Sequence, residues 1–172
     1  GLQAGDKVRI GLISDTHGIV EPAFRALDLM GPLDLLVHAG DHYHDASAIA
    51  ARVDFPVHAV VGNCDSRLEG PEEKILELDG MRIYITHGHK YNVKISLLRL
   101  YHRAVEVRAA VAVYGHTHVS GYCHTPYEGC PDSGGLLLIN PGSVSKPRNG
   151  DKYSFGLLEI TDGLIKPSIM NL

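Results

Sequence analysis

The amino-acid sequence predicts an α/β fold in which two β-sheets pack together and helices cover their outer faces. Short apolar runs alternate with helical patterns over residues 8–63, an order that is typical of parallel strands joined by right-handed crossovers. Alternating apolar and polar residues then flank Asp79-Gly80, which is a strong signal for a β-hairpin. A chain of 172 residues can bury a substantial core, so we expect a single domain over residues 1–172.

In the first half of the chain, three apolar runs are short and bounded by polar residues, as expected of buried strands. They cover residues 8–14, 33–40 and 56–63. Between the first two, apolar residues recur at helical spacing from Phe24 to Met30, and Gly31 suits the end of that helix. A shorter helix is predicted over residues 45–52.

The second half begins with the hairpin and continues with an amphipathic helix over residues 93–107. Residues 121–134 are rich in Gly, Pro, Cys and Tyr, so they are predicted to form a loop. Further strands are predicted at residues 109–115, 135–143, 154–160 and 165–170.

Composition excludes some classes of protein. The net charge of −4 argues against a broad basic surface for nucleic acid. No apolar run reaches the roughly 20 residues that span a bilayer. An odd count of 3 cysteines favours free thiols and a cytoplasmic location, with a Cys123–Cys130 disulfide as the alternative. We expect residues 1–6 to be a frayed or added end and leave them out of the fold.

Polar clusters follow five of the predicted strands. They read "SDTH", "AGDHYHD", "GNCDS", "THGHK" and "GHTHV" along the chain. Because ligands of open α/β sheets gather outside the carboxyl ends of the strands, we expect the five clusters to converge on one site.

The side chains in these clusters are oxygen or imidazole ligands, which suit Mn²⁺, Fe²⁺, Ni²⁺, Co²⁺ or Zn²⁺ in a reactive site better than a structural zinc. The candidates are Asp15, His17, Asp41, Asn63, His87, His116 and His118. Two residues separated by one, as in the pairs Asp15/His17 and His116/His118, face the same way if the chain is extended. Neighbouring glycines allow close backbone approach.

Each cluster alone has a simpler interpretation. Asp15 suits the cap of the following helix, Gly40-Asp41 suits an ordinary turn, and a single histidine at a strand end is usually a surface residue. The ordered set of five clusters, all at strand ends, is what favours a metal site.

The motifs "DTH", "GD", "GNCD", "THGH", "GHTH" and "NPGS" together resemble the calcineurin-like metallophosphoesterase superfamily. The resemblance covers residues 8–160 and is strongest to its small single-domain bacterial and archaeal phosphodiesterases. It implies a four-layer α-β-β-α sandwich of two mixed sheets, and a dinuclear metal centre, with Mn²⁺ as the first expectation, that activates water for in-line attack on phosphorus.

Transferred position by position, the resemblance assigns the ligands to two metal ions that share Asp41. The first ion would be held by Asp15, His17, Asp41 and His118, and the second by Asp41, Asn63, His87 and His116. It also implies that Asp41, Asn63 and His116 are catalytic residues.

One position departs from the pattern of many family members. Cys64 stands in "GNCD" where these members have a histidine that protonates the leaving group. Because a thiol is a poorer proton donor, we expect a preference for aryl phosphodiesters over alkyl monoesters. The simpler interpretation of Cys64 is a small residue in a tight corner.

Other polar residues invite weaker predictions. His38 and His58 suit hydrogen-bonded positions within strands. His102 and His124 suit the surface. His42 and His44 lie close to Asp41 in the sequence and are candidates for contact with phosphate. Asp65 is expected to orient a ligand or the nearby backbone. Asn140 and Ser143 suit either a turn or support of the site, and His89 is the weaker ligand candidate of its pair with His87.

The alternatives to a phosphodiesterase are a phosphomonoesterase and a non-catalytic scaffold, since the family also includes a retromer subunit that uses the fold mainly for protein contacts. A hydrolase acting on carbon centres fits the order of the clusters less well, and no His-Glu-x-x-His motif is present. We expect a small phosphoester substrate, no membrane partner, no nucleic-acid surface and a homodimer. The sequence does not identify the substrate.

Overall fold

The computed structural model describes residues 6–78, 80–125, 135–146 and 152–172. The first sheet has the strand order β10-β9-β1-β2-β3, in which β1, β2 and β3 are parallel while β9 and β10 are antiparallel to their neighbours. Its strands are β1 (Lys7–Ile13), β2 (Leu35–His38), β3 (Val57–Ala59), β9 (Ser154–Thr161) and β10 (Leu164–Asn171). The crossovers between the parallel strands contain α1 (Glu21–Met30) and α2 (Tyr43–Ala50).

The second sheet has the order β4-β5-β6-β8-β7, with a parallel centre and antiparallel edges. Its strands are β4 (Glu73–Leu78), β5 (Met81–Thr86), β6 (Val111–Val113), β7 (Gly121–Thr125) and β8 (Leu136–Asn140). A 3₁₀ turn (His89–Tyr91) and α3 (Leu98–Glu106) connect β5 to β6.

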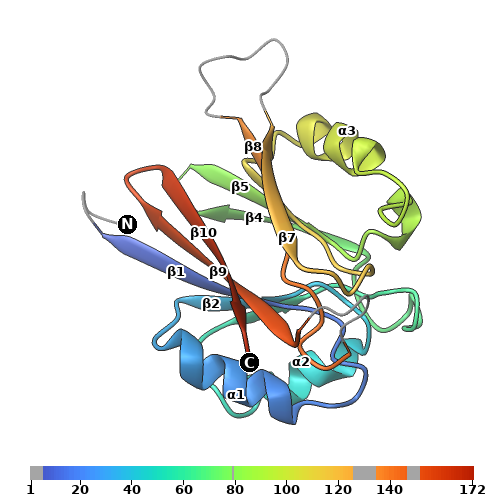
Figure 1. Cartoon of the computed structure of the whole chain (residues 1–172), viewed down its shortest axis with the longest axis vertical. Coiled ribbons are helices and arrows are strands. Elements are labelled where there is room, and N and C mark those ends of the chain that lie inside the picture. The colour runs from blue at the N-terminus through green and yellow to red at the C-terminus, as the bar shows by residue number, and fades with distance from the viewer. Residues whose placement is uncertain (1–5, 79, 126–134, 147–151) are drawn as a thin grey trace.

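The two sheets face each other, and helices lie outside both of them (Figure 1). Alternation of side chains along β1 shows how the layers arise: Ile10 and Leu12 enter the core between the sheets, whereas Ile13 packs under α1. On the far side, Leu100 of α3 and Ala112 of β6 belong to one buried apolar cluster. The predicted four-layer α-β-β-α sandwich of two mixed sheets is therefore confirmed.

Most predicted elements are present. The hairpin pairs β4 with β5 around position 79, which itself lies outside the described residues. The first helix ends as expected at Gly31, which has φ 75° and donates its N–H to the Leu27 carbonyl. The second helix was predicted two residues too late.

Two predictions were wrong in extent. The helix predicted over residues 93–107 begins only at Leu98, because Asn92 adopts a left-handed conformation and Ser96 Oγ accepts the N–H of Leu98. Residues 121–125 form the edge strand β7 instead of a loop. Its central side chains are exposed, so no apolar alternation marks this strand in the sequence.

Residues 1–5 and 126–134 lie outside the described residues, and the second range includes Cys130, so the alternative of a Cys123–Cys130 disulfide is not tested. Cys64 and Cys123 are free. None of the described helices has both the length and the apolar character that a membrane crossing requires.

Candidate metal centre

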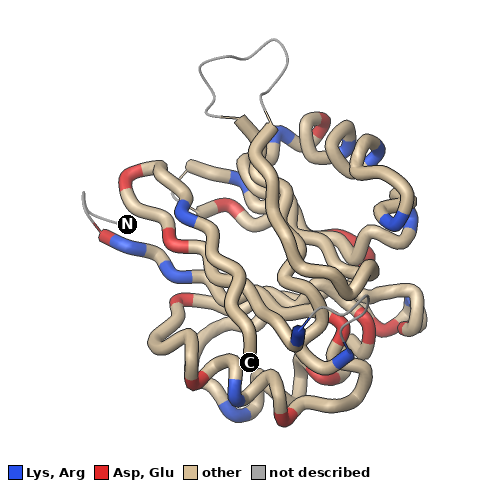
Figure 2. Tube along the Cα trace, viewed as in Figure 1, with Lys and Arg blue, Asp and Glu red and all other residues tan. Residues whose placement is uncertain are grey.

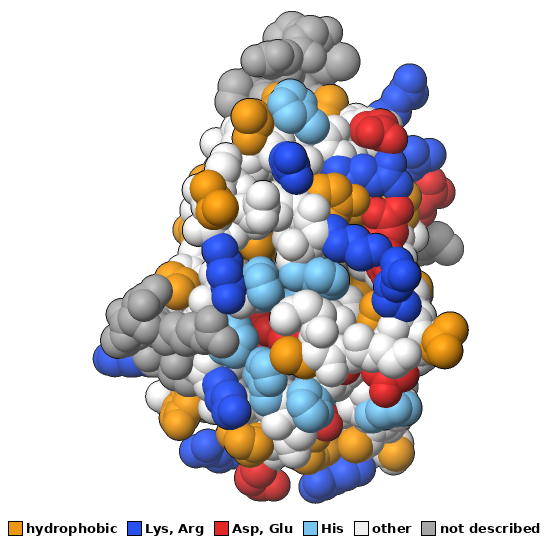
Figure 3. Space-filling view, turned by 90° about the vertical axis from the view of Figure 1, so that its right-hand side faces the viewer, with side chains coloured by type: hydrophobic (Ala, Val, Ile, Leu, Met, Phe, Trp, Pro, Cys, Tyr) orange, Lys and Arg blue, Asp and Glu red, His pale blue; other side chains and the backbone are white. Residues whose placement is uncertain are grey.

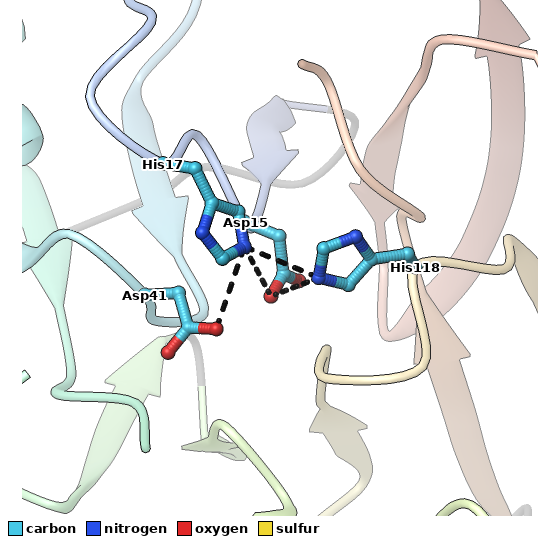
Figure 4. A group of neighbouring side chains, drawn as sticks. All are labelled: Asp15, His17, Asp41 and His118. Atoms are coloured by element: carbon cyan, nitrogen blue, oxygen red, sulfur yellow. Dashed lines mark hydrogen bonds and ion pairs between the residues drawn. The ribbon is translucent and has the colours of Figure 1, made fainter. Parts of the chain in front are cut away.

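Side chains from both sheets meet at the carboxyl ends of β1, β2, β5 and β6. Asp15 and His17 follow β1, Asp41 follows β2, and His118 follows β6. One ligand atom from each of these four residues lies within 4.8 Å of every other, and Figure 4 shows the four side chains pointing toward one another. The structure therefore brings together the whole set that the resemblance assigns to the first metal ion.

The shortest contacts within this group join imidazole nitrogens to carboxylate oxygens. His118 Nε2 lies 3.1 Å from Asp15 Oδ1, and His17 Nε2 lies 3.5 Å from Asp41 Oδ2. The two Nε2 atoms of His17 and His118 are 3.2 Å apart. Oxygen and nitrogen donors thus face a common point, which is the arrangement that a divalent transition-metal ion requires.

The two carboxylates are deeply buried, with exposed fractions of 0% for Asp15 and 2% for Asp41. Within the described part of the chain, their ion-pair partners are histidines and include no Lys or Arg. Burial alone raises the pKa of Asp15, but hydrogen bonds from His118, His17 and His87 outweigh it and hold that pKa well below its usual range. Two buried anions without a permanent cation are suited to binding one.

The backbone fixes the orientation of the His118 ring. Its Nδ1 lies 2.5 Å from the carbonyl oxygen of Lys146, and a carbonyl can only accept a hydrogen bond. Nδ1 therefore carries a proton, and in the neutral ring the lone pair is on Nε2, which is the atom facing Asp15. A histidine whose other nitrogen donates to a carbonyl is the usual form of a metal ligand.

Of the remaining three candidates, His87 is held as closely as the first four residues, whereas Asn63 and His116 are not. His87 is fully buried, and its Nε2 lies 3.0 Å from Asp15 Oδ1 and 3.4 Å from Asp41 Oδ2. The His116 ring centroid is 5.0 Å from that of His87. Asn63 is exposed. Among the described residues, neither the Asn63 side chain nor the His116 ring forms a hydrogen bond or ion pair with Asp41.

His116 nevertheless contributes to the site in two ways. Its backbone N–H donates to Asp15 Oδ2 at 3.2 Å. Burial, together with the nearby His87 and Lys94, lowers the pKa of its side chain to about 4. The ring is therefore neutral at pH 7, as a ligand must be.

The local backbone differs from the sequence-based expectation. Asp15 and His17 have φ values of 55° and 49°, and His116 and His118 have 71° and 61°. Both pairs are left-handed, so the extended backbone under which the two members of a pair would face the same way is not present here. Such conformations are costly outside glycine and concentrate at functional sites.

Two glycines allow the loops to approach one another. A Cβ on Gly62 would lie 2.1 Å from Asp41 Oδ1, and a Cβ on Gly115 would lie 2.2 Å from Ser14 Oγ. With glycine at position 62, Asp41 Oδ1 is free of this clash and accepts a hydrogen bond from the backbone N–H of Cys64 at 3.0 Å. The glycines next to the motifs are therefore required by close packing around the two carboxylates.

Residues around the candidate ligands hold the loops in place. Asp65 accepts the N–H groups of Gly62 and Tyr43, at 2.8 and 3.0 Å. Ser143 Oγ donates to the Asp15 carbonyl at 2.8 Å, and Asn140 Nδ2 donates to Thr117 Oγ1 at 2.8 Å. Asp65 thus orients backbone as expected, and the "NPGS" segment supports the site as well as turning.

The other histidines separate into distinct groups. His38 is buried and hydrogen-bonded, and His58 lies in β3 beside Lys74 Nζ. His102 and His124 are exposed, as expected. Their positions agree with structural or surface roles.

Three more histidines lie near the candidate ligands. His89 Nδ1 is 3.2 Å from His87 Nδ1, so it contacts a candidate ligand. The exposed His42 ring lies 5.5 Å from the His17 ring, whereas His44 pairs with Glu69. Of the two candidates for phosphate contact, His42 is therefore the better placed.

The role of Lys146 could not be predicted from the sequence, because it is the backbone carbonyl that accepts from His118 and any residue type supplies a carbonyl. The charged residues give little further guidance: Lys and Arg are spread over many segments of the chain (Figure 2). Histidines, by contrast, gather in the middle of one face, with Lys and Arg at its borders (Figure 3).

Comparison with known proteins agrees with this site. Residues 8–163 match the model of the calcineurin-like phosphoesterase superfamily domain. The chain belongs to this superfamily. This chain is 33% identical over 150 residues to the probable metallophosphoesterase YsnB of Bacillus subtilis, and the match covers 87% of this chain and 82% of YsnB.

Two further similarities point the same way. The chain is 28% identical to the phosphodiesterase YfcE of Escherichia coli K12, with 88% of each chain covered. A crystal structure of a predicted phosphoesterase from Streptococcus pneumoniae TIGR4 superposes with a TM-score of 0.78 at 28% identity, covering 98% of this chain and 91% of that one. Membership of the family shows a phosphoester hydrolase of the metallophosphoesterase type.

Proposed function

We propose that this protein is a phosphodiesterase that depends on two divalent metal ions. The observation that carries the proposal is the convergence of Asp15, His17, Asp41 and His118 within 4.8 Å. The donors fit a metal ion: two buried carboxylates have histidines as their ion-pair partners in the described chain, and His118 presents Nε2 in the ligand tautomer. Asp41 would be shared between the ions, with Asn63, His87 and His116 completing the second group.

Bound there, divalent cations would activate water for in-line attack on phosphorus and neutralise charge on the phosphoryl oxygens. The protein's own residues have separate tasks. Asp15 and Asp41 supply negative charge in a buried position, and the Cys64 N–H orients Asp41 through its Oδ1. Exposed Asn63 and half-buried His116 leave the second group open to a substrate.

The preference for diesters with good leaving groups rests on Cys64. Although Cys64 is exposed, partial desolvation and the neighbouring Asp41 and Asp65 raise the pKa of its thiol, which makes the thiol an even weaker acid than usual. A leaving group must then depart largely as its own anion. The name of the relative YfcE supports the same substrate class.

The test is hydrolysis of bis(p-nitrophenyl) phosphate by the purified protein with added Mn²⁺, combined with elemental analysis. We expect steady turnover that is lost in Asp15→Ala and His118→Ala and retained in His102→Ala, an exposed histidine on α3. Faster hydrolysis of an alkyl monoester than of the aryl diester would contradict the diesterase proposal and favour a phosphomonoesterase.

Absence of activity with Mn²⁺, Ni²⁺, Co²⁺, Fe²⁺ or Zn²⁺ would instead favour the scaffold function.

We further propose Mn²⁺ as the preferred ion, a small phosphoester as substrate, a cytoplasmic location and a homodimer, without a membrane or nucleic-acid partner. Gel filtration with light scattering tests the dimer.

A further inference from the structure

A buried chain of hydrogen bonds joins the two loops that carry His17 and Asp41, and none of its members is a candidate ligand. Thr16 and His38 have exposed fractions of 0%. Thr16 Oγ1 lies 3.0 Å from His38 Nε2 and 2.5 Å from Asp45 Oδ2. Asp45 lies in the first turn of α2, immediately after the Asp41 loop.

Every donor and acceptor in this chain can be assigned. The backbone N–H of Gly40 lies 3.1 Å from His38 Nδ1 and can only donate, so Nδ1 accepts. Burial lowers the pKa of His38, which keeps the ring neutral with its one proton on Nε2. Nε2–H then donates to Thr16 Oγ1, and the single hydroxyl proton of Thr16 is directed at Asp45.

The same carboxylate oxygen of Asp45 makes a second contact. Asp45 Oδ2 accepts the backbone N–H of Gly18 at 2.8 Å. Thr16 and Gly18 are the two neighbours of His17, so one oxygen atom accepts a hydrogen bond from the residue on each side of it, from the Thr16 hydroxyl and from the Gly18 backbone N–H. His17 has φ 49°, a left-handed conformation that is unfavourable outside glycine and persists only when surrounding contacts impose it.

We propose that Asp45, Thr16 and His38 are positioning residues that hold His17 in its left-handed conformation with Nε2 directed at Asp15 and Asp41. This inference rests on the proposed metal-dependent function. The bonds involve both neighbours of His17, which is assigned to the first group alone, whereas His87 and His116 of the second group follow strands of the second sheet. Loss of the chain should therefore weaken the first group of ligands and spare the second.

The proposal is tested by titrating the metal-free protein with Mn²⁺ alone and measuring the affinity of each site by calorimetry and by electron paramagnetic resonance. Removing a residue that orients a ligand costs roughly 10–100-fold in metal affinity. We expect Asp45→Ala and Thr16→Val to weaken one Mn²⁺ site by about this factor and leave the other within about threefold.

Conservative variants separate positioning from general stability. Asp45→Asn keeps an oxygen acceptor and Thr16→Ser keeps the hydroxyl, so both should bind Mn²⁺ like the wild type. Ser47→Ala, at an exposed position of the same helix, is the matched control. The absorption spectrum of the Co²⁺-loaded protein should change in Asp45→Ala and be restored in Asp45→Asn.

The outcomes are distinguishable. If the wild type binds no Mn²⁺, the proposed function itself fails, and this inference fails with it. If the wild type binds Mn²⁺ and Asp45→Ala binds it equally well, the positioning role alone is refuted. Equal weakening in Asp45→Asn and Asp45→Ala would also refute it, because charge instead of hydrogen bonding would be responsible. Should Thr16→Val not fold, half-buried Asp45 decides the question.

Discussion

The two groups of candidate ligands that share Asp41 differ in how firmly the protein holds them. His17 and His118 lie within 3.5 Å of a buried carboxylate oxygen, and the Lys146 carbonyl fixes the His118 ring. Asn63, by contrast, is exposed, and the His116 ring is only half-buried. The difference teaches that the first group is preorganised by the fold, while the second group, apart from the buried His87, is accessible to solvent and thus to a substrate.

This asymmetry also suggests a division of tasks. A group whose ligands are fixed by buried partners binds an ion with little reorganisation, whereas an open group can exchange its surroundings during turnover. We therefore expect the first ion to bind more tightly than the second. Four perturbations test the comparison, in decreasing order of expected effect.

Replacing the shared carboxylate should have the largest effect. Asp41 is the one residue assigned to both groups, and it contacts both His17 and His87. We expect Asp41→Ala to reduce diesterase activity by about 10²–10³-fold and to lower the metal content below the proposed two ions per chain. Inductively coupled plasma mass spectrometry measures the content, and retention of both ions would refute the sharing of Asp41.

Replacing one ligand from each group should separate the two. We expect His118→Ala to weaken binding of the tighter Mn²⁺ ion by about 100-fold, and Asn63→Ala to weaken binding of the other ion by about tenfold. These values are the two ends of the usual range for a loss of metal affinity when a metal site is perturbed. The larger cost follows from the burial of His118, which has an exposed fraction of 3%. Mn²⁺ titration measures both, and a greater loss in Asn63→Ala would reverse the proposed order.

A methyl group at Gly62 should disturb the shared residue indirectly. The added Cβ would lie 2.1 Å from Asp41 Oδ1 and 2.5 Å from the Asp41 backbone nitrogen, so the Asp41 loop must move. We expect Gly62→Ala to lower the free energy of unfolding by about 1–3 kcal/mol and to weaken Mn²⁺ binding. Chemical denaturation and titration measure these effects.

Gly121→Ala is the matched control for this substitution. Nothing lies within 4 Å of a Cβ at Gly121, in the edge strand β7. It should leave both unfolding and Mn²⁺ binding unchanged. If Gly62→Ala behaves in the same way, close packing around Asp41 does not control the position of that residue.

The sequence predicts the buried half of the molecule better than its exposed half, for a physical reason. Strands such as β1 and β6 are covered on both faces, so continuous apolar runs mark them. The edge strand β7 has exposed side chains in its centre and carries no such pattern. The start of α3 is set by the backbone of Asn92 and the hydroxyl of Ser96, which a periodicity of apolar residues does not register.

The same distinction holds within the candidate site. Asp15, His17, Asp41 and His118 could be predicted because carboxylates and imidazoles at strand ends are recognisable by type and position. The left-handed conformation of these residues, the Lys146 carbonyl and the Asp45 bonds could not, because they depend on how loops distant in sequence meet. Side-chain chemistry is therefore readable from sequence, and the hydrogen bonds that orient it are not.

The smallest expected effect concerns the pH dependence of the metal-free protein. The pKa of His116 falls from 6.5 to about 4 in the folded state, chiefly through burial. As pH falls below 6.5, the unfolded chain takes up a proton at this residue and the folded protein does not, so stability decreases until the folded ring also titrates near pH 4. Above pH 6.5 the residue contributes no pH dependence.

Urea denaturation with a chelator present, between pH 7 and pH 4.5, should give a shallower loss of stability for His116→Asn than for the wild type. Parallel profiles for the two proteins would show that His116 is as accessible to protons in the fold as in the unfolded chain, and that the open half of the site is more open than the burial of its ring implies.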